Sequence, residues 1–249
     1  MRLDENKRVW DIEYKWPENG DEWSVGWGGT KYMWFGSIFP RIFNFLPTNK
    51  ILEIAPGFGR CTQFLKDLCK RLIIVDISKK CIDFCKKRFK KNDNIDYYVN
   101  DGKKLDFIDN NSIDFIFSWD SFVHIESNET KSYIAEFSRV LKEEGYGFIH
   151  HSNLGSFKEE DLPEDTLVRS RSMSAKLFNE FCKQYGLQII IQEIVPWGNI
   201  QNLDCLSLFT KNSDRKINEI IINNKEFVQE KINMKRVSKF YKKVADIDL

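Results

Sequence analysis

The stretch Ile51-Leu-Glu-Ile-Ala-Pro-Gly-Phe-Gly-Arg60 decides the fold. Its apolar start predicts a buried strand that ends at Ala55, before a tight turn at Gly57 and Gly59. The residues that follow, Thr62–Leu68, predict a helix. A strand, a small-residue turn and a helix form the opening unit of a nucleotide-binding α/β sheet. Gly57 and Gly59 carry no Cβ, so the backbone can approach a ligand closely.

The turn departs from the dinucleotide-binding fingerprint G-x-G-x-x-G. Thr62 stands where the third glycine of that fingerprint would pack the helix against the strand. The pattern from Glu53 to Gly59 is instead acid-x-Ala-x-Gly-x-Gly. Glu53 is an acid at the carboxyl end of a strand, where open α/β sheets bind their ligands.

Composition narrows the class of protein. A chain of 249 residues forms one large α/β domain or two small ones. A net charge of +1 does not call for nucleic acid or an anionic membrane as partner. No apolar run approaches the ~20 residues of a membrane span, and the N-terminus lacks the apolar core of a signal peptide. The six cysteines contain no C-x-x-C pair, which favours reduced structural thiols in a cytoplasm over zinc.

A second apolar run, Arg71–Asp76, predicts a parallel strand covered on both faces. Its terminal acid, Asp76, lies 17 residues after Gly59. An acid at the end of the second strand is placed to accept hydrogen bonds from ribose hydroxyls. The alternative is that Asp76 begins the next helix, although Ser78 is the better N-cap.

Strands and helices alternate along the rest of the chain. Further strands are predicted at Ile95–Val99, Ile113–Ser118, Tyr146–His151, Gln188–Val195 and Cys205–Thr210, and helices at Lys79–Lys90, Glu129–Leu141 and Ser174–Tyr185. The last two strands, joined through Trp197-Gly198, are predicted to form a hairpin. We therefore expect an α/β fold with a mostly parallel sheet, a final antiparallel hairpin and helices on both faces.

The ordered set of Glu53–Gly59, Asp76, Asp101 and the segment after the fourth strand resembles the class I S-adenosylmethionine (SAM) methyltransferases over about residues 50–210. The resemblance implies a Rossmann-like, seven-stranded sheet with SAM as cofactor. It implies that an acid at Asp101 contacts the adenine amino group, although Asp101-Gly102 is also a common turn pair. The implied cofactor-binding residues are Glu53, Ala55, Gly57, Gly59, Arg60, Asp76, Ile77, Asp101, Gly102, Trp119, Trp27 and Trp34.

Within that group the chain is similar to methyltransferases encoded in bacterial capsule and O-antigen clusters. The similarity is carried by Gly20–Trp23, Trp27–Gly29, Phe117–Ser121 with His124, His150–Asn153 and Ser172–Ala175. It implies O-methylation of a sugar, a nucleotide-linked sugar or a phosphoramidate group. The alternatives are an N-methyltransferase acting on a small molecule or amino sugar, and a non-catalytic SAM-fold partner subunit.

A nucleic-acid acceptor is not expected. Enzymes that methylate exocyclic amino groups of bases carry Asn/Asp-Pro-Pro-aromatic after the fourth strand, where this chain has Ser118-Trp-Asp-Ser121. The net charge near zero agrees with this view. We expect a small-molecule or carbohydrate acceptor, and one form of this hypothesis links the acceptor to a nucleotide. We also expect no membrane insertion and a cytoplasmic location.

The chain divides into a Trp-rich cap (1–48), a SAM-binding domain (49–211) with an acceptor-loop insertion (152–172), and a helical tail (212–249). Five of the seven tryptophans fall in the cap, which predicts an irregular segment with a short helix near Thr30–Phe39. The cap either covers one sheet edge or closes as a lid, whose aromatic faces would attract a sulfonium cation. The tail is compatible with an oligomer contact.

All three histidines, His124, His150 and His151, follow or end the fourth and fifth strands, on the rim where the sheet binds ligands. In a strand His150 and His151 point to opposite faces. Transfer of a methyl group to a hydroxyl requires removal of its proton, which suits histidine. We therefore expect His151 or His124 to be the general base, with Asp120 orienting the base or the acceptor.

The insertion contributes the expected acceptor-binding residues. Arg169 and Arg171 offer guanidinium groups that suit a phosphate, and Asn153 stands at the start of the same segment. The alternative is a solvated loop with exposed arginines. Asp120 and the histidines are compatible with a divalent metal, but no metal site is predicted.

Overall fold

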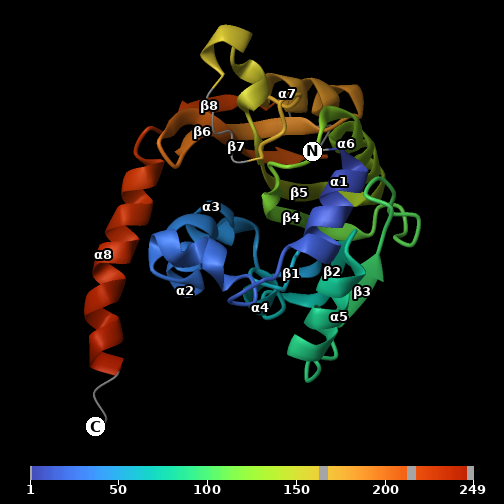
Figure 1. Ribbon diagram of the computed structural model, residues 1–249. Coiled ribbons are helices and arrows are strands. Elements are labelled where there is room, and N and C mark those ends of the chain that lie inside the picture. The colour runs from blue at the N-terminus through green and yellow to red at the C-terminus, as the bar shows by residue number, and fades with distance from the viewer. Residues whose placement is uncertain (1, 163–167, 212–216, 246–249) are drawn as a thin grey trace.

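The computed structural model describes residues 2–162, 168–211 and 217–245, with side chains through Tyr241. Its core is a mixed sheet of eight described strands in the order β3-β2-β1-β4-β5-β7-β6-β8 (Figure 1). The strands are β1 (Thr48–Ile54), β2 (Cys69–Asp76), β3 (Ile95–Val99), β4 (Ile113–Phe122), β5 (Leu141–Ser152), β6 (Gln188–Trp197), β7 (Ile200–Thr210) and β8 (Ile220–Asn223). The first five run parallel, and β7 is antiparallel to β5 and β6. The predicted mostly parallel sheet with a final hairpin is confirmed.

Helices pack on both faces of the sheet, as predicted. On one face, Phe137 and Phe178 join an apolar cluster with the sheet, and on the other Leu65 and Ile82 join a second one. The helices are α1 (Leu3–Arg8), α2 (Thr30–Met33), α3 (Phe39–Ile42), α4 (Thr62–Leu65), α5 (Lys79–Arg88), α6 (Ser127–Val140), α7 (Ala175–Gln184) and α8 (Phe227–Ala245). The helix after the Gly57 turn, α4, is shorter than expected and ends in a turn before Leu68.

Two serines start helices where the sequence placed them. The Ser78 hydroxyl accepts the Cys81 N–H at the start of α5, and the Ser174 hydroxyl accepts the Leu177 N–H at the start of α7. Each cap satisfies a backbone donor that has no partner inside the helix. The Ser78 cap leaves the Asp76 carboxylate at the strand end, on the side of the sheet where ligands bind.

The tail is not helical throughout. Ile220–Asn223 forms β8, which pairs parallel with the outer edge of β6. Three consecutive β-branched residues, Ile220–Ile222, favour a strand once an open sheet edge is available. The sheet therefore has one strand more than the seven expected. Residues 212–216, where the tail was expected to begin, lie outside the described residues.

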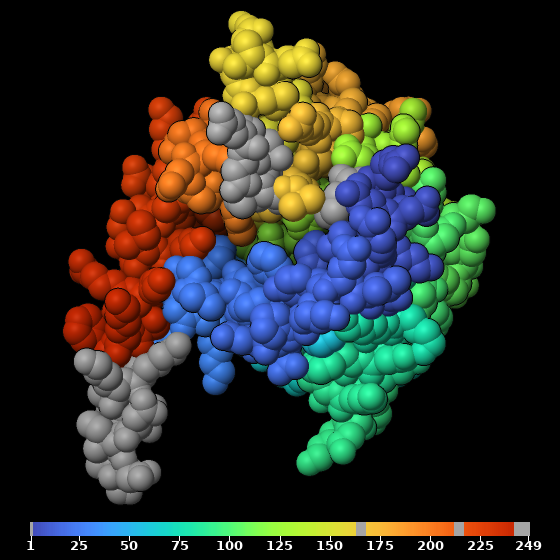
Figure 2. All heavy atoms as spheres, viewed as in Figure 1, coloured from blue at the N-terminus to red at the C-terminus, as the bar shows by residue number. Residues whose placement is uncertain are grey.

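The cap lies across the carboxyl edge of the parallel strands, between α8 and α5 (Figure 2). It contains α1, a π-helical turn at Val9–Glu13, a 3₁₀ helix at Asp21–Trp27, α2 and α3. The helix α1 was not predicted, because its residues Leu3–Arg8 are almost all polar and show no apolar period. It is tied to the sheet rim by the Asn6 side chain, which donates to the His124 carbonyl at 3.0 Å.

Three glycines of the cap receive the helix α8, which runs alongside the cap in Figure 1. A Cβ on Gly26 would lie 1.8 Å from Lys231 Cε, one on Gly28 2.0 Å from Ser238 Oγ, and one on Gly36 2.5 Å from Met234 Cγ. The helix residues are spaced by three and four positions, so they lie on one face of α8. The absence of side chains at the three glycines therefore allows close packing of the two terminal segments.

We predict that Gly28→Ala destabilises the protein more than Gly186→Ala. Both glycines have a positive φ, +91° and +74°, so an alanine at either position costs about 1–2 kcal/mol of backbone strain. Only Gly28 faces α8, and the overlap with Ser238 adds about 1–3 kcal/mol. Urea unfolding of the two variants measures the difference. Equal losses of stability would mean that α8 does not pack tightly on the cap.

Candidate active site

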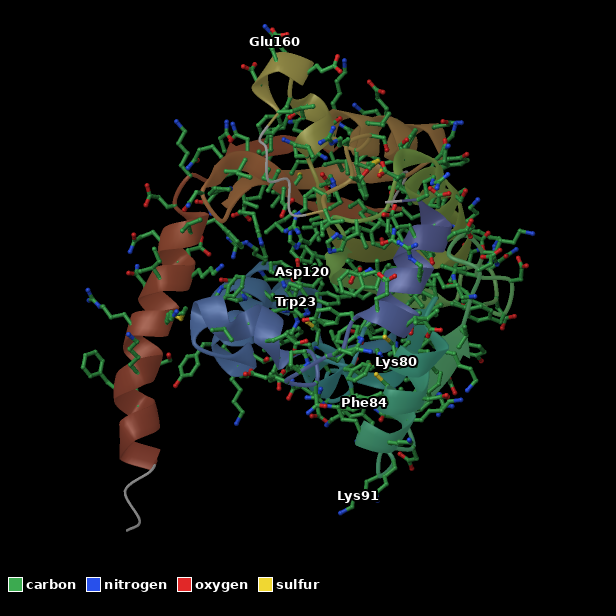
Figure 3. All side chains as sticks on the ribbon, in the orientation of Figure 1. Trp23, Lys80, Phe84, Lys91, Asp120 and Glu160 are labelled. Atoms are coloured by element: carbon green, nitrogen blue, oxygen red, sulfur yellow. The ribbon has the colours of Figure 1, made fainter. Side chains whose placement is uncertain are left out.

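A cavity of about 800 Å³ lies at the carboxyl edge of the sheet. It is lined by the turn after β1, the ends of β2 and β4, the helix α1, the cap and one residue of α8. Its volume falls in the range of small-molecule sites, about 300–1,000 Å³. Asp120 of β4 and Trp23 of the cap both line the cavity, and Figure 3 shows them near each other in the middle of the view.

The turn after β1 has the geometry that its sequence predicts. Ala55, Gly57 and Gly59 all adopt positive φ angles, of 54°, 56° and 84°. Ala55, Gly57 and Arg60 line the cavity. Gly59 is not among the lining residues, and a Cβ there would lie 2.5 Å from the Phe89 ring. The expectation that Gly59 contacts the cofactor is therefore corrected, because its small size serves packing against α5.

Two buried acids line the cavity beside this turn. The Thr62 hydroxyl donates to Glu53 at 2.6 Å, and burial raises the pKa of Glu53 to about 8. Asp76 accepts the N–H groups of Gly57 and Ser78 at 3.1 and 2.9 Å, and burial raises its pKa to about 7. Asp76 thus lies at the expected ribose position and also orders the glycine turn.

The adenine side of the expected site needs one correction. Ile77 and Gly102, which are expected to bind the cofactor, line the cavity. Asp101 does not line it. Its carboxylate is exposed and accepts the N–H groups of Lys103 and Lys104, at 2.9 and 2.8 Å. The turn interpretation of Asp101 is the correct one in this structure.

The tryptophans of the cap divide into two groups. Trp27 and Trp34, expected at the cofactor, are buried in the core and do not line the cavity. Trp34 stacks on Phe64, with ring centroids 4.9 Å apart. The aromatic cap residues that do line the cavity are Trp10, Tyr14, Trp16 and Trp23. The Trp-rich composition of the cap indicated that aromatic residues would form this wall of the cavity. Without a periodic pattern, the sequence did not indicate which of them would do so.

Trp16 is the cap residue that lies over the glycine turn. Its ring stacks on Phe58 at 4.5 Å, and a Cβ on Gly57 would come within 2.8 Å of it. The cap is therefore both a cover for the sheet edge and a wall of the cavity. Closure of the cap as a lid over a cofactor stays a prediction.

A buried network of charges forms the far wall of the cavity. Arg60 pairs with Asp120 at 3.1 Å, and Arg169 pairs with Asp204 at 3.0 Å. Arg169 also lies 3.9 Å from Asp120. Burial opposes ionisation of Asp120, but the charges of Arg60 and Arg169 outweigh it and hold the pKa of Asp120 below its usual range. Asp120 is therefore a stable anion that can orient a ligand.

His150 belongs to this network rather than to the cavity surface. The Asp120 N–H donates to Nδ1 of His150 at 3.2 Å, so the ring proton is on Nε2, which donates to Asp204 at 3.1 Å. The ring packs against Trp119 and Trp197. With both nitrogens engaged and no lining position, His150 is not a candidate for the base.

His151 lies on the opposite face of the sheet, as the strand period predicts. Its ring stacks on Phe178 of α7, and Nε2 is 2.8 Å from the Ser207 hydroxyl. The side chain is fully buried, and burial lowers its pKa to about 4. His151 does not line the cavity. The expectation that it serves as the base is wrong in this structure, because the cavity lies on the other side of the strand.

His124 is the histidine that lines the cavity. Its Nδ1 lies 3.0 Å from the Val168 carbonyl, which only accepts, so Nδ1 carries the proton in the neutral ring. Burial, with the charge of Arg169, lowers the pKa of His124 to about 4. The ring is therefore neutral at pH 7. The segment from Asp120 to His124 is a strand end and a turn rather than a helix.

Of the expected acceptor residues, Arg169 alone lines the cavity. It is buried, binds Asp204 through two nitrogens and lies over the Trp197 ring at 5.2 Å. Arg171 is exposed outside the cavity. Asn153 is also outside it, and its side chain bonds the Asn202 carbonyl and the Ala175 N–H. These two expectations are corrected, and residues 163–167 of the insertion lie outside the described residues.

Two of the unanticipated lining residues come from the last third of the chain. Trp197 comes from the end of β6 and Lys231 from α8. Sequence alone gave no sign that these segments reach the site, since their approach depends on the sheet order and on the packing of α8. Trp119, expected from the sequence, lines the cavity, and its buried Nε1 has no hydrogen-bond partner among the described residues.

No group of three or more His, Cys, Asp or Glu residues in the described ranges is arranged to hold a metal ion. No helix of the described chain combines the length and apolar character that crossing a bilayer requires.

Comparison with known proteins gives the domain type. Residues 51–145 match the protein family described as "Methyltransferase domain". Ribosomal RNA small subunit methyltransferase A of Coxiella burnetii is 35% identical over 60 residues. That match spans 24% of this chain and 23% of the relative, so it covers about a quarter of either protein.

Solved structures extend the likeness beyond that domain. A SAM-dependent methyltransferase from Leishmania major aligns with a TM-score of 0.62 and 14% identity, over 84% of this chain and 82% of its own. A protein from Pyrococcus horikoshii OT3 aligns with a TM-score of 0.56 and 21% identity, over 70% and 87%. At these identities the likeness concerns the fold. Residues 51–145 thus match a methyltransferase domain, and the chain has the Rossmann-like fold of these solved structures.

We predict that Glu53→Gln changes how stability depends on pH. The Glu53 carboxyl has a usual pKa of 4.5 and a folded pKa of about 8, so folding takes up a proton between these values. The stability that the protonated carboxyl contributes is complete below pH 4.5 and is lost as the pH rises toward 8. Between pH 5 and 7 this loss is about 2 kcal/mol. The Glu53→Gln variant has no carboxyl group at this position, so it does not show this loss of stability.

Urea unfolding of both proteins at pH 5 and pH 7 isolates the effect of Glu53, because Asp76 and the buried histidines titrate in both. The wild type should lose stability relative to the variant as the pH rises. A difference between the two proteins that is the same at both pH values would contradict the protonated state of Glu53.

Proposed function

We propose that this protein is a SAM-dependent methyltransferase that methylates a hydroxyl group of a small acceptor. The acceptor would be a sugar, a nucleotide-linked sugar or a phosphoramidate-bearing building block of a surface polysaccharide. The observation that supports the proposal most directly is one continuous cavity. It joins the glycine turn of the methyltransferase domain to a wall of aromatic and charged side chains.

The residues present fit SAM. Gly57 of the turn lines the cavity, and Asp76 lies at the end of β2, where it would accept bonds from ribose hydroxyls. Ile77 and Gly102 would flank the adenine, and Glu53 lies beneath the turn. When bound, SAM supplies a methyl group carried on a sulfonium cation. The nearby acids and the aromatic faces of the cap would favour that positive charge.

The other half of the cavity would hold the acceptor. Trp10, Trp23 and Trp197 provide flat apolar surfaces, while Asp120 and Arg169 provide polar groups that are fixed by their ion pairs. Flat apolar walls with a few fixed polar groups match a sugar-like molecule, which has both apolar faces and hydroxyl edges. The cap encloses this half, which favours a small acceptor over a structured RNA.

We assign the role of general base to His124. At neutral pH its ring is uncharged and can accept a proton. The Val168 carbonyl accepts the hydrogen bond of Nδ1–H. The lone pair that takes up a proton is therefore on Nε2. Asp120, whose charge is stabilised by Arg60, would orient the acceptor hydroxyl. The proton of the hydroxyl would pass to His124 as the new O–C bond forms, and the bond between the methyl group and the sulfur of the donor would break in the same step.

We predict that Gly57→Val abolishes SAM binding measured by calorimetry. The position has a φ of +56°, which a β-branched residue does not adopt, and its Cβ would collide with Trp16. A second variant, Asp76→Ala, should weaken SAM binding by about 1–3 kcal/mol while leaving the turn glycine in place. Thermal melting reports whether each variant is folded. SAM affinity at the wild-type level in both folded variants would refute this cofactor site.

We predict that His124→Ala lowers turnover about 10²–10⁴-fold, with SAM affinity unchanged. Turnover is measured as S-adenosylhomocysteine formed with a panel of sugars and nucleotide sugars. Because the pKa of His124 is about 4, the wild-type rate should hold from pH 7 to about pH 5 and fall below it as the ring gains a proton. A variant within about threefold of the wild type would show that His124 is not the base.

A further inference from the structure

We infer that Lys231 forms an anion subsite in the acceptor half of the cavity, so that the acceptor carries a phosphate or carboxylate group. This inference rests on the proposed function, because it names the acceptor class of the same cavity. Lys231 reaches the cavity from α8, a helix that follows the methyltransferase domain and that the sequence left without a role.

The first turn of α8 is held firmly against the body of the protein. Phe227 is 1% exposed, and its ring packs against Trp27 and Trp197. Arg41 binds both Glu193 and Glu230, at 2.6 and 3.1 Å. Lys231 follows Glu230 directly. Its backbone position is therefore fixed by a buried aromatic ring and a three-residue ion network.

The cap is shaped to admit the Lys231 side chain. A Cβ on Gly26 would lie 1.8 Å from Cε and 2.6 Å from Nζ of Lys231. No other residue type at position 26 would leave the lysine stem where it lies. Because Gly26 itself lines the cavity, the ammonium group of Lys231 lies at the cavity wall rather than in open solvent.

The ammonium group has aromatic neighbours but no ion-pair partner among the described residues. Nζ lies 4.8 Å from the Trp27 ring centroid and 5.5 Å from that of Trp197. No carboxylate of the described chain lies within 4.0 Å of Lys231 Nζ. An ammonium group has three donors and is strongly hydrated. A half-buried one on two indole faces has donors to offer to a ligand.

The local balance of charge agrees with an anionic ligand. Three cations, Arg60, Arg169 and Lys231, face two carboxylates, Asp120 and Asp204. The two carboxylates are already bound by the arginines. Arg169 and Lys231 also share the Trp197 ring. An anion placed beside Lys231 would pair with the one cation of these three that has no carboxylate within 4.0 Å among the described residues.

Other carboxylates line the cavity, but they are engaged or come from other elements. Glu22 accepts bonds from the Tyr14 hydroxyl and from the N–H groups of Gly20 and Glu18. The acids at the α1 and α6 sides are Glu5, Glu13, Glu126 and Glu129. None of these is within ion-pair distance of Lys231 in the described chain.

The test compares Lys231→Gln with Lys239→Gln, an exposed lysine two turns further along α8 that does not line the cavity. Calorimetry of the full chain, saturated with S-adenosylhomocysteine, measures binding of three probes: inorganic phosphate, uridine diphosphate and glucuronate. Binding of at least one probe is expected. Lys231→Gln should weaken that binding at least about tenfold, as for loss of a charged hydrogen bond, and Lys239→Gln should not.

The three probes separate the sources of the anion. Binding of uridine diphosphate or phosphate alone identifies a phosphate, and binding of glucuronate alone identifies a carboxylate. Lys231→Arg should keep most of the affinity, which a purely structural role of the lysine would not predict. Failure of all three probes to bind the wild type, or equal affinity of the Lys231→Gln variant, would overturn the subsite.

The affinity for S-adenosylhomocysteine, measured first, keeps this test separate from the proposed function. If the wild-type protein does not bind S-adenosylhomocysteine, the methyltransferase proposal itself is contradicted. Thermal melting of each variant confirms that the charge change, and not unfolding, is responsible.

Discussion

The site depends on one buried chain of charged and polar groups. Arg60 from the glycine turn binds Asp120 at the end of β4, and the Asp120 backbone binds His150 of β5. His150 in turn binds Asp204 of β7, which holds Arg169 from the insertion. Five separate segments thus meet in one network. Removing one member of such a buried pair leaves its partner charged and unpaired, which costs about 3–5 kcal/mol.

The network also explains why the acceptor wall differs from the cofactor side. Around Glu53 and Asp76 the partners are hydroxyl and backbone N–H groups, and burial raises both pKa values. Around Asp120 the partners are arginines, which hold the carboxylate ionised. One cavity therefore contains acids that readily take up a proton at one end and a permanent anion at the other. A cation bound beside Glu53 and Asp76 would lower both pKa values and favour the ionised carboxylates.

Much of the fold followed from local patterns. Apolar runs such as Arg71–Asp76 located the parallel strands, and serine caps located the helices. The strand β8 was missed because Ile220–Ile222 also fits a helical stripe, and only the open edge of β6 decides between the two. Within the site, the period of two placed His150 and His151 on opposite faces. The strand period alone does not predict which face of the sheet bears the cavity, because that depends on the position of the cap.

The packing of α8 on the glycines of the cap has a consequence for the order of assembly. Gly26 leaves the ribosome early and Lys231 late, yet the two touch at the wall of the cavity. The sheet strands β1 to β5 lie between them in the chain and can pair first. During synthesis the aromatic side chains of the cap therefore stay uncovered until α8 emerges. A nascent chain would hold a complete sheet before it holds a complete acceptor pocket.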